Sequence, residues 1–470
     1  MMASTQVSIS QDRAQSFYRS VWRWHFYAAL FCIPFVLWLA TTGSIYLFRP
    51  QVEAWLDQPY EHLAVSGERW PADMQIGAAL SAVPGSNLHY YQLPRSAQSA
   101  VQIVVGRQTQ EYRIYVNPYT LQVLHIVSED QRIMRRIFHL HGELMLGDKG
   151  SWIVETAASW TIVMILTGLY LWWPRDTKSL AGVLYPRLGR SGRVFWRDLH
   201  AVTGFWVSAL ALTFLLSGLP WAKSWGAYLK LARRLAGQSN VRQDWTTGRS
   251  SEIAQRMAMN DNAGALLNDH TGHMGHIDMG YVAPEAYKGI DAVVPAVEPL
   301  HLAFPVLISP PKKAGGPWLA KSDSQDRVLR DQVTVSAATG TILSRSNFNQ
   351  LPWIDRAVGV GVAMHEGHLY GWLNQLVNLC TALGLIVLCV SAIAMWWKRR
   401  PKGVLGAPIK QVNSGFRFAF ALILGCLAIY LPLFGLTLAF TLFTERLILS
   451  HLPAARTWLG LNPPLDSTCT

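Results

Sequence analysis

The chain has 470 residues, of which half are hydrophobic and only 15% are charged. This balance is typical of a membrane protein and argues against a chain of two to four soluble domains. The formal net charge is +12. Nearly all of this excess lies in three basic segments that we expect to stay in the cytoplasm. It therefore indicates membrane orientation and contact with anionic membrane lipid, and it gives no support to nucleic-acid binding.

Five stretches of the sequence are long and apolar enough to cross a membrane. A transmembrane helix needs roughly 20 apolar residues to span about 30 Å of hydrocarbon. The stretches are residues 26–48, 152–173, 201–222, 374–397 and 416–443. The first is too long for the apolar part of a signal peptide and lacks a convincing small-residue cleavage site, so we expect it to be retained as a helix.

The distribution of Lys and Arg orients these spans, because short basic loops stay in the cytoplasm. The basic segments, predicted to be cytoplasmic, are residues 1–25, 174–199 and 398–415. The remaining connections, predicted to lie on the outer side, are residues 49–151, residues 223–373 and the tail 444–470. The sequence therefore predicts a multi-pass membrane protein with a cytoplasmic amino terminus.

The spans contain an internal repeat, which in membrane proteins often places a ligand site between the two copies. His25 at the start of the first span matches His200 at the start of the third, and one constant offset relates these two spans. His141, before the second span, matches His365, before the fourth. The closing "LWWPR" of the second span matches "MWWKRR" of the fourth at the same offset as these histidines. Four histidines thus recur in register.

The outer segments share a pattern as well. "YRIYVNPYTLQVL" and "QVTVSAATGTIL" each alternate apolar and polar residues, then break at a short polar turn before a second strand. We therefore predict an α-helical membrane protein of about five transmembrane helices, internally duplicated, with two outer α+β domains. The fifth span carries no histidine, so we assign it a packing role.

Topology places the four histidines at two depths, with His25 and His200 at the cytoplasmic level and His141 and His365 at the outer level. Two neutral imidazoles from different helices can hold a haem iron within a bundle. Since the chain has no Cys-x-x-Cys-His motif, both haems would be non-covalent and b-type. A single interfacial histidine is more often a polar anchor, but four in register favour ligation.

Further residues could assist these four. Arg23 and Arg197 lie two and three residues before the inner histidines, where haem propionates would emerge, and arginine suits carboxylates. His139 and His368 lie close to the outer pair. If residues 365–368 are helical, His368 lies on about the same face as His365. Either ring could then ligate a metal while the other binds a propionate.

A separate outer loop, "NDHTGHMGHIDMGY", combines closely spaced histidines with methionine sulfur. This composition suits copper or a transient iron contact. Because flexible glycine-rich loops seldom preorganise a site, an adventitious contact is at least as well supported, and we do not count the loop as a metal site.

Several of these segments resemble the PepSY-associated transmembrane family: "WRWH", "HLHGELMLG", "WRDLHAVTGFW", "VTVSAATGTIL" and "MHEGHLYG". The resemblance extends over nearly the whole chain. It implies PepSY-like periplasmic domains, a bacterial inner-membrane location and a link to iron uptake, because the family includes ferric-siderophore reductases of the inner membrane.

Together these features predict a di-haem electron-transfer protein. Haems at two depths carry electrons across a bilayer, which ordinary side chains cannot do. The chain has no glycine-rich dinucleotide motif after a strand, so a separate flavoprotein or quinol supplies the electrons. By resemblance the acceptor is a ferric siderophore. The alternatives are a non-redox PepSY protein that binds peptides or regulates a partner, and a haem reductase that uses copper or quinone.

Overall fold

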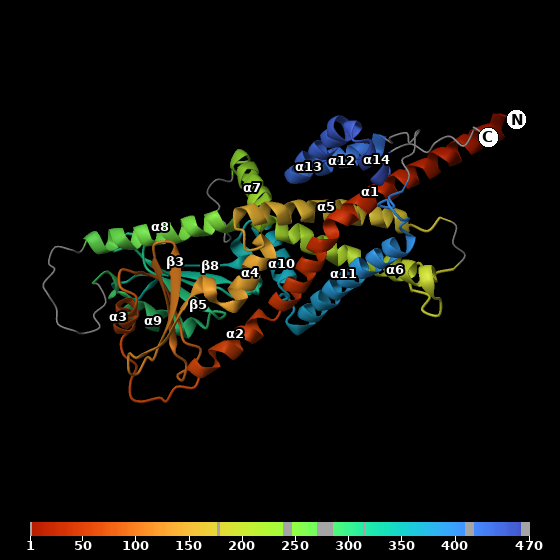
Figure 1. The fold of residues 1–470 in the computed structure, drawn as a ribbon. Helices are drawn as coiled ribbons and strands as arrows, with labels where there is room; N and C mark the ends of the chain where they lie inside the picture. The colour runs from red at the N-terminus through yellow and green to blue at the C-terminus, as the bar shows by residue number, and fades with distance from the viewer. Residues whose placement is uncertain are drawn as a thin grey trace. The chain divides into compact units, whose positions relative to one another are not determined.

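The computed structural model describes residues 2–175, 179–237, 247–269, 285–313, 315–408 and 418–461. The chain divides into two compact units, each described here by itself. The helical unit comprises Met1–Ser44, His141–Val241 and Leu376–Thr470, and the sheet unit comprises Ile45–Leu140 and Arg242–Gln375. Figure 1 traces the chain through both.

Five of the described helices are long and apolar enough to cross a membrane. They are Gln15–Tyr46 in α1 (Met2–Tyr46), α5 (Asp148–Trp172), Gly192–Trp221 from α6 (Gly192–Gly218) into η3 (Leu219–Trp221), α11 (Trp372–Arg399) and Pro432–His451. The first four overlap the first four predicted spans. Both histidine-bearing helices begin well before their histidine, so His25 and His200 lie inside a helix and not at its first turn.

The fifth predicted span, 416–443, is wrong as a single helix. The structure has α12 (Phe418–Tyr430), a break at Leu431, and α13 (Pro432–Phe443). Proline lacks an amide hydrogen and disfavours helical backbone in the residue before it, and Leu431 has φ −119° and ψ 84°. The chain folds back there, because a Cβ added at Gly435 would lie 3.1 Å from Cβ of Ala428.

The sequence predicted that the tail lies on the membrane side opposite to the amino-terminal flank. The described part of the tail instead contacts Arg23, close to that flank. Beyond α13 the chain continues through Thr444–Ile448 and Leu449–His451 to α14 (Pro453–Trp458). The amide of Leu405, in the connection after α11, donates to the Trp458 carbonyl at 3.0 Å. Arg23 donates to the Gly460 carbonyl at 2.7 Å. The break at Leu431 explains the error, because α12 and α13 pack as a pair and return the chain to the same end.

The sheet unit is built on one antiparallel sheet with the strand order β4-β3-β2-β1-β5-β6-β7-β8. The strands are β1 (Asn87–Gln92), β2 (Val101–Arg107), β3 (Gln110–Val116), β4 (Val123–Ser128), β5 (Val306–Ser309), β6 (Trp318–Ser322), β7 (Asp331–Val335) and β8 (Ile342–Asn347). β1 pairs with β5 through Tyr91 with Ile308 and Gln92 with Leu307. The two outer α+β domains that the sequence predicted therefore share a continuous sheet.

Each half of the sheet has the same order of elements. α3 (Ala72–Ala82) precedes β1, and α9 (Ile290–Val297) precedes β5. Short 3-10 turns and then α4 (Ile133–Glu143) and α10 (Trp353–His365) follow β4 and β8. The two predicted hairpins, β3–β4 and β7–β8, are present, each with one register shift at the end of its first strand.

The two faces of the sheet differ in polarity. α3 and α9 contact each other and cover one face (Figure 1). Apolar side chains such as Ile76, Ile103, Ile290 and Trp318 form the core there. α8 (Gly248–Asp269) lies against β1 and β2, and its polar and charged side chains bond to His89 on β1 and Glu111 on β3. The sheet therefore holds one helical layer by apolar burial and α8 by ion pairs and hydrogen bonds.

Candidate functional site

The two inner histidines come together inside the helical unit. His25 on α1 and His200 on α6 have ring centroids 6.4 Å apart, with their planes at 78°. They are far apart in sequence, and they were paired above only because the repeat matches them. The structure thus places side by side the two imidazoles that the sequence assigned to one site.

Each ring is held from behind by the same arrangement of groups. His25 Nδ1 lies 3.0 Å from the Met164 carbonyl oxygen and 3.2 Å from Thr167 Oγ1 on α5. His200 Nδ1 lies 3.1 Å from the Leu388 carbonyl oxygen and 3.2 Å from Ser391 Oγ on α11. These partners match one another at the offset that relates the second and fourth spans. The sequence analysis missed Thr167 and Ser391, although that offset could have revealed them.

These contacts leave one nitrogen of each ring for a ligand. Only a protonated Nδ1 can donate to a carbonyl, so a neutral ring carries its lone pair on Nε2. Nε2 of His25 and of His200 makes no hydrogen bond to any residue that the structure describes. A backbone carbonyl behind Nδ1 is the usual support of a metal-binding histidine. The pair therefore has the hydrogen-bonding state that iron ligation requires.

The spacing of the rings also suits a shared metal ion. Imidazole nitrogens bind transition metals at ~2.0–2.1 Å and the ring centroid lies about 1.1 Å behind the nitrogen, so rings on opposite sides of one ion have centroids about 6.3 Å apart. The observed 6.4 Å agrees with this separation. Glycine at position 168 gives His25 its room, because an added Cβ would lie 3.0 Å from Cε1 of the ring.

The two arginines predicted to bind propionates differ. Arg23 is buried, and its Nη1 donates to the carbonyls of Pro408 at 2.6 Å and Gly460 at 2.7 Å. Its Nη2 is buried without a hydrogen-bond partner in the described part of the chain. The Arg197 side chain is 58% exposed and pairs with buried Asp198 at 2.7 Å. Arg23 therefore keeps a buried donor for a carboxylate, whereas Arg197 is engaged by its neighbour.

Of the outer pair, His141 lies in the last turn of α4, beside the end of the first span. Its Nδ1 is 2.9 Å from Thr42 Oγ1, and a Cβ added at Gly43 would lie 3.2 Å from its Cε1. The Thr-Gly dipeptide at the end of the first span thus contacts an outer histidine. His141 belongs to the helical unit and His365 to the sheet unit, so their pairing stays a prediction.

The sequence predicted that His365 and His368 share a helix face, but in the structure they do not. α10 ends at His365, and Gly367 with φ +79° turns the backbone away from helix. His368 Nε2 is buried without a hydrogen-bond partner among the described residues. Burial and the nearby charge of Arg49 lower the His368 pKa to about 4. His368 is thus a neutral imidazole with an unused ring nitrogen.

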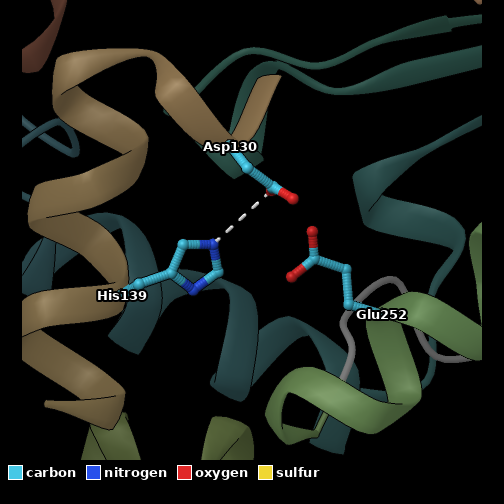
Figure 2. A group of neighbouring side chains, drawn as sticks. All are labelled: Asp130, His139 and Glu252. Carbon is cyan, nitrogen blue, oxygen red and sulfur yellow. Dashed lines mark ion pairs between the residues drawn. The ribbon is translucent and has the colours of Figure 1, made fainter. Parts of the chain in front are cut away.

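His139 lies in a different cluster, in the sheet unit. Figure 2 shows it facing Asp130 and Glu252, whose ligand atoms and its own all lie within 4.8 Å of one another. Two carboxylates and an imidazole could in principle hold a metal ion. His139 Nε2 lies 4.0 Å from Asp130 Oδ1, and His139 is buried.

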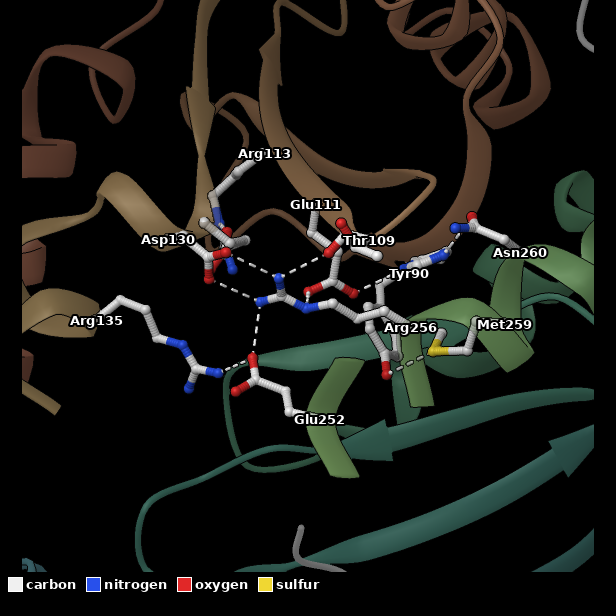
Figure 3. Close-up of polar contacts among 12 residues, drawn as sticks. Tyr90, Thr109, Glu111, Arg113, Asp130, Arg135, Glu252, Arg256, Met259 and Asn260 are labelled. Atoms are coloured by element: carbon white, nitrogen blue, oxygen red, sulfur yellow. Dashed lines mark hydrogen bonds and ion pairs between the residues drawn. The ribbon is translucent and has the colours of Figure 1, made fainter. Parts of the chain in front are cut away.

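Arginines already occupy this cluster. Arg249 donates to His139 Nε2 at 3.2 Å and also pairs with Asp130. Arg256 pairs with Asp130 at 3.1 Å and with Glu252 at 2.7 Å (Figure 3). With its nitrogen lone pair accepting from a guanidinium and both carboxylates neutralised, the group is an ion-pair network. His139 therefore has a structural environment that does not favour iron ligation.

The histidine and methionine loop singled out in the sequence lies at residues 268–281. His270, His273, Met274, His276 and Met279 fall outside the residues that the structure describes.

Most of the chain is similar to a known family of membrane proteins. A family model for the PepSY-associated TM region matches residues 22–399. None of the curated proteins compared with the chain matches it. The matched range includes both inner histidines, Thr167 and Ser391, and it ends before α12.

Proposed function

Because the chain belongs to the PepSY-associated transmembrane family, we propose that this multi-pass membrane protein transfers electrons across the bacterial inner membrane. It acts as a haem-dependent reductase of ferric siderophores. His25 and His200 hold one non-covalent b-type haem at the cytoplasmic level, and His141 and His365 hold a second at the periplasmic level. A bound haem supplies one-electron redox chemistry.

The observation that carries this proposal is the geometry of the inner pair. The ring centroids are 6.4 Å apart, and each Nδ1 is satisfied by a carbonyl of a neighbouring helix. A pair of histidines that served only as polar anchors would have no reason to hold their ring centroids at the separation that a shared metal ion requires. The buried, unpartnered Nη2 of Arg23 supports the same interpretation, since a propionate would satisfy it.

The chain's own residues would define the two ends of the path. At the inner end, Arg23 binds a propionate and orients the macrocycle. The electron donor is a flavoprotein or a quinol, because the chain carries no dinucleotide motif. At the outer end, the sheet unit provides the surface on which the ferric siderophore docks. Oxygen-rich chelators favour iron(III), so reduction to iron(II) weakens their hold and releases the metal.

The direct test is reoxidation of the reduced protein. Purified protein is reduced with dithionite, freed of excess reductant, and mixed with ferric hydroxamate and ferric catecholate complexes while the haem spectrum is followed. We expect rapid return of the oxidised spectrum with at least one chelate, with iron(II) trapped by ferrozine. The His25→Ala, His200→Ala double variant is the control and should transfer electrons at least 10-fold more slowly. Unchanged spectra with every chelate would remove the reductase proposal.

A protein isolated without haem would instead favour a non-redox role, in which the outer sheet binds peptide or a partner protein. Reoxidation by copper(II) or quinone alone would keep the haem and change the acceptor.

A further inference from the structure

Two buried hydroxyls lie in equivalent places behind the inner histidines. Thr167 Oγ1 is 3.2 Å from His25 Nδ1, and Ser391 Oγ is 3.2 Å from His200 Nδ1. Both residues are buried, with Ser391 fully so. Neither belongs to the set of expected haem ligands.

Each hydroxyl also bonds the carbonyl that receives the histidine. Thr167 Oγ1 lies 2.9 Å from the carbonyl oxygens of both Met164 and Val163, to which it donates, and the Met164 oxygen accepts from His25 Nδ1 at 3.0 Å. Ser391 Oγ donates to the Leu388 carbonyl at 2.9 Å, and that oxygen accepts from His200 Nδ1 at 3.1 Å. A closed triangle of carbonyl, hydroxyl and imidazole is therefore built twice, on two helices far apart in the sequence.

The direction of the proton in each hydroxyl follows from its partners. The single hydroxyl hydrogen points to a carbonyl of its own helix, since a carbonyl can only accept. The oxygen lone pairs then face Nδ1, which must bring the proton to that contact. Each Nδ1–H is thus shared between two acceptors, and the tautomer with a bare Nε2 is fixed before any ligand binds.

We infer that Thr167 and Ser391 are positioning residues that fix the tautomer of the inner histidines and set the reduction potential of the metal they hold. This inference rests on the proposed haem at His25 and His200. Acceptors behind Nδ1–H make an imidazole a stronger electron donor, which stabilises iron(III) and lowers the potential. Their removal therefore shifts the potential of the inner haem in the positive direction.

Intrahelical hydroxyls often bond only to the backbone of their own helix, and the chain offers matched examples. Thr161 on α5 donates to the Ala157 carbonyl at 2.7 Å, and Thr381 on α11 donates to the Val377 carbonyl at 2.8 Å. Both are buried and neither is bonded to a histidine. They lack the feature that the inference assigns to Thr167 and Ser391.

The experiment compares Thr167→Val and Ser391→Ala with the controls Thr161→Val and Thr381→Val. The inner haem is identified as the component lost in His25→Ala, and its potential is measured by optical redox titration. We expect both test variants to shift this potential positively and to retain haem about 10- to 100-fold less tightly. The controls should match the wild type, and the conservative variants Thr167→Ser and Ser391→Thr should restore its values.

Two results distinguish a failure of the proposed function from a failure of this inference. If the wild type holds no haem, the proposed function is removed and this inference with it. If the wild type holds haem but both test variants keep its potential and its affinity, only the inference is overturned.

A second experiment needs no variant of Thr167 or Ser391. The tautomers of His25 and His200 are read by nitrogen NMR of the haem-free protein with labelled histidine. It should show Nδ1–H at His25 and His200, and Nε2–H tautomers would contradict the inference.

Discussion

The availability of a ring nitrogen distinguishes the histidines of this chain from one another. His25 and His200 donate through Nδ1 and leave Nε2 without a partner among the described residues. His139 accepts from Arg249, so its lone pair is used. His368 has a buried Nε2 that bonds to nothing described. By this criterion, His368 is better suited than His139 to serve an outer metal or propionate.

His368 should make the stability of the protein depend on pH. Its pKa falls to about 4 in the folded state because burial and Arg49 disfavour the charged ring, whereas an exposed histidine has a pKa near 6.5. Between these two pKa values the unfolded state therefore binds more protons than the folded state. The contribution of neutral His368 to the free energy of unfolding is fully present above pH 6.5 and is lost as the pH falls toward 4. Thermal unfolding in detergent from pH 7.5 to 4.5 should show this loss.

The variant His368→Gln should flatten that part of the pH profile, because glutamine does not titrate. An exposed histidine variant, His125→Gln, is the matched control and should keep the wild-type slope. An unchanged profile in His368→Gln would show that other groups cause the dependence.

At the level of single residues, the sequence correctly brought His25 and His200 together but predicted the surroundings of these rings poorly. The repeat paired His25 with His200 because the spans that carry them match at one offset. It could not separate Arg23 from Arg197, since only the fold shows that the Arg197 side chain pairs with the adjacent Asp198. The two backbone carbonyls that accept from Arg23 are distant from it in sequence. Hydrogen bonds between helices depend on side chains that are distant in sequence, and periodicity does not report them.

Among the elements, α8 is held to the sheet in an unusual way. Four polar side chains, Arg249, Glu252, Arg256 and Asn260, recur at the spacing of one helix face and make its ion pairs and hydrogen bonds, beside a contact of Met259 with Tyr90. Arg256 is at the centre, where it pairs with Glu111 on β3 at 2.9 Å as well as with Asp130 and Glu252 (Figure 3). An element held by charges is more sensitive to the loss of one member than one held by apolar burial.

Replacing Arg256 should therefore loosen α8. The variant Arg256→Leu leaves three carboxylates around a buried position without their common partner, which costs about 3–5 kcal/mol for a buried pair. Hydrogen exchange along residues 248–262 should become much faster. Arg345→Leu is the control, because that side chain is 51% exposed and, among the described residues, forms an ion pair with Asp331 alone, so its loss should cost less than about 1 kcal/mol. Protected α8 amides in Arg256→Leu would refute the role of the network.

Element boundaries show where sequence patterns compete. Hydropathy predicted one span over 416–443, but Pro432 and the break at Leu431 divide it, and a local backbone rule won over a long apolar run. The end of α10 was missed for the same reason, since Gly367 adopts a positive φ that helical periodicity ignores. The β3–β4 and β7–β8 hairpins were predicted correctly, because strand alternation and turn chemistry agree there.

For the whole molecule, the order of elements in the sheet unit and the hydrogen bonds behind the inner histidines both occur twice. The matched histidines, carbonyls and hydroxyls are on α1 with α5 and on α6 with α11. In the sheet unit the two runs of four strands meet at β1 and β5. The sequence predicted two runs, but it could not show that they share one sheet, because edge pairing between them involves few residues and no local signal.

The fold of the carboxy-terminal segment makes a topological prediction. Its hydrogen bonds to Arg23 and Leu405 place it at the same membrane side as the amino-terminal flank. In a background without native cysteines, Ala454→Cys should react with an impermeant maleimide from the same side as Arg19→Cys, and Glu68→Cys from the opposite side. Labelling of Ala454→Cys together with Glu68→Cys would contradict the return of the chain at Leu431.

The haem-to-protein ratio tests the central claim most directly, and it is best measured on wild type and single histidine variants purified in parallel. We predict two haems per chain in the wild type, and one in His25→Ala and in His200→Ala, each with the same remaining spectrum. Exposed His451→Ala should keep both. Wild-type protein without haem, or His25→Ala and His200→Ala variants that still hold two, would contradict the account.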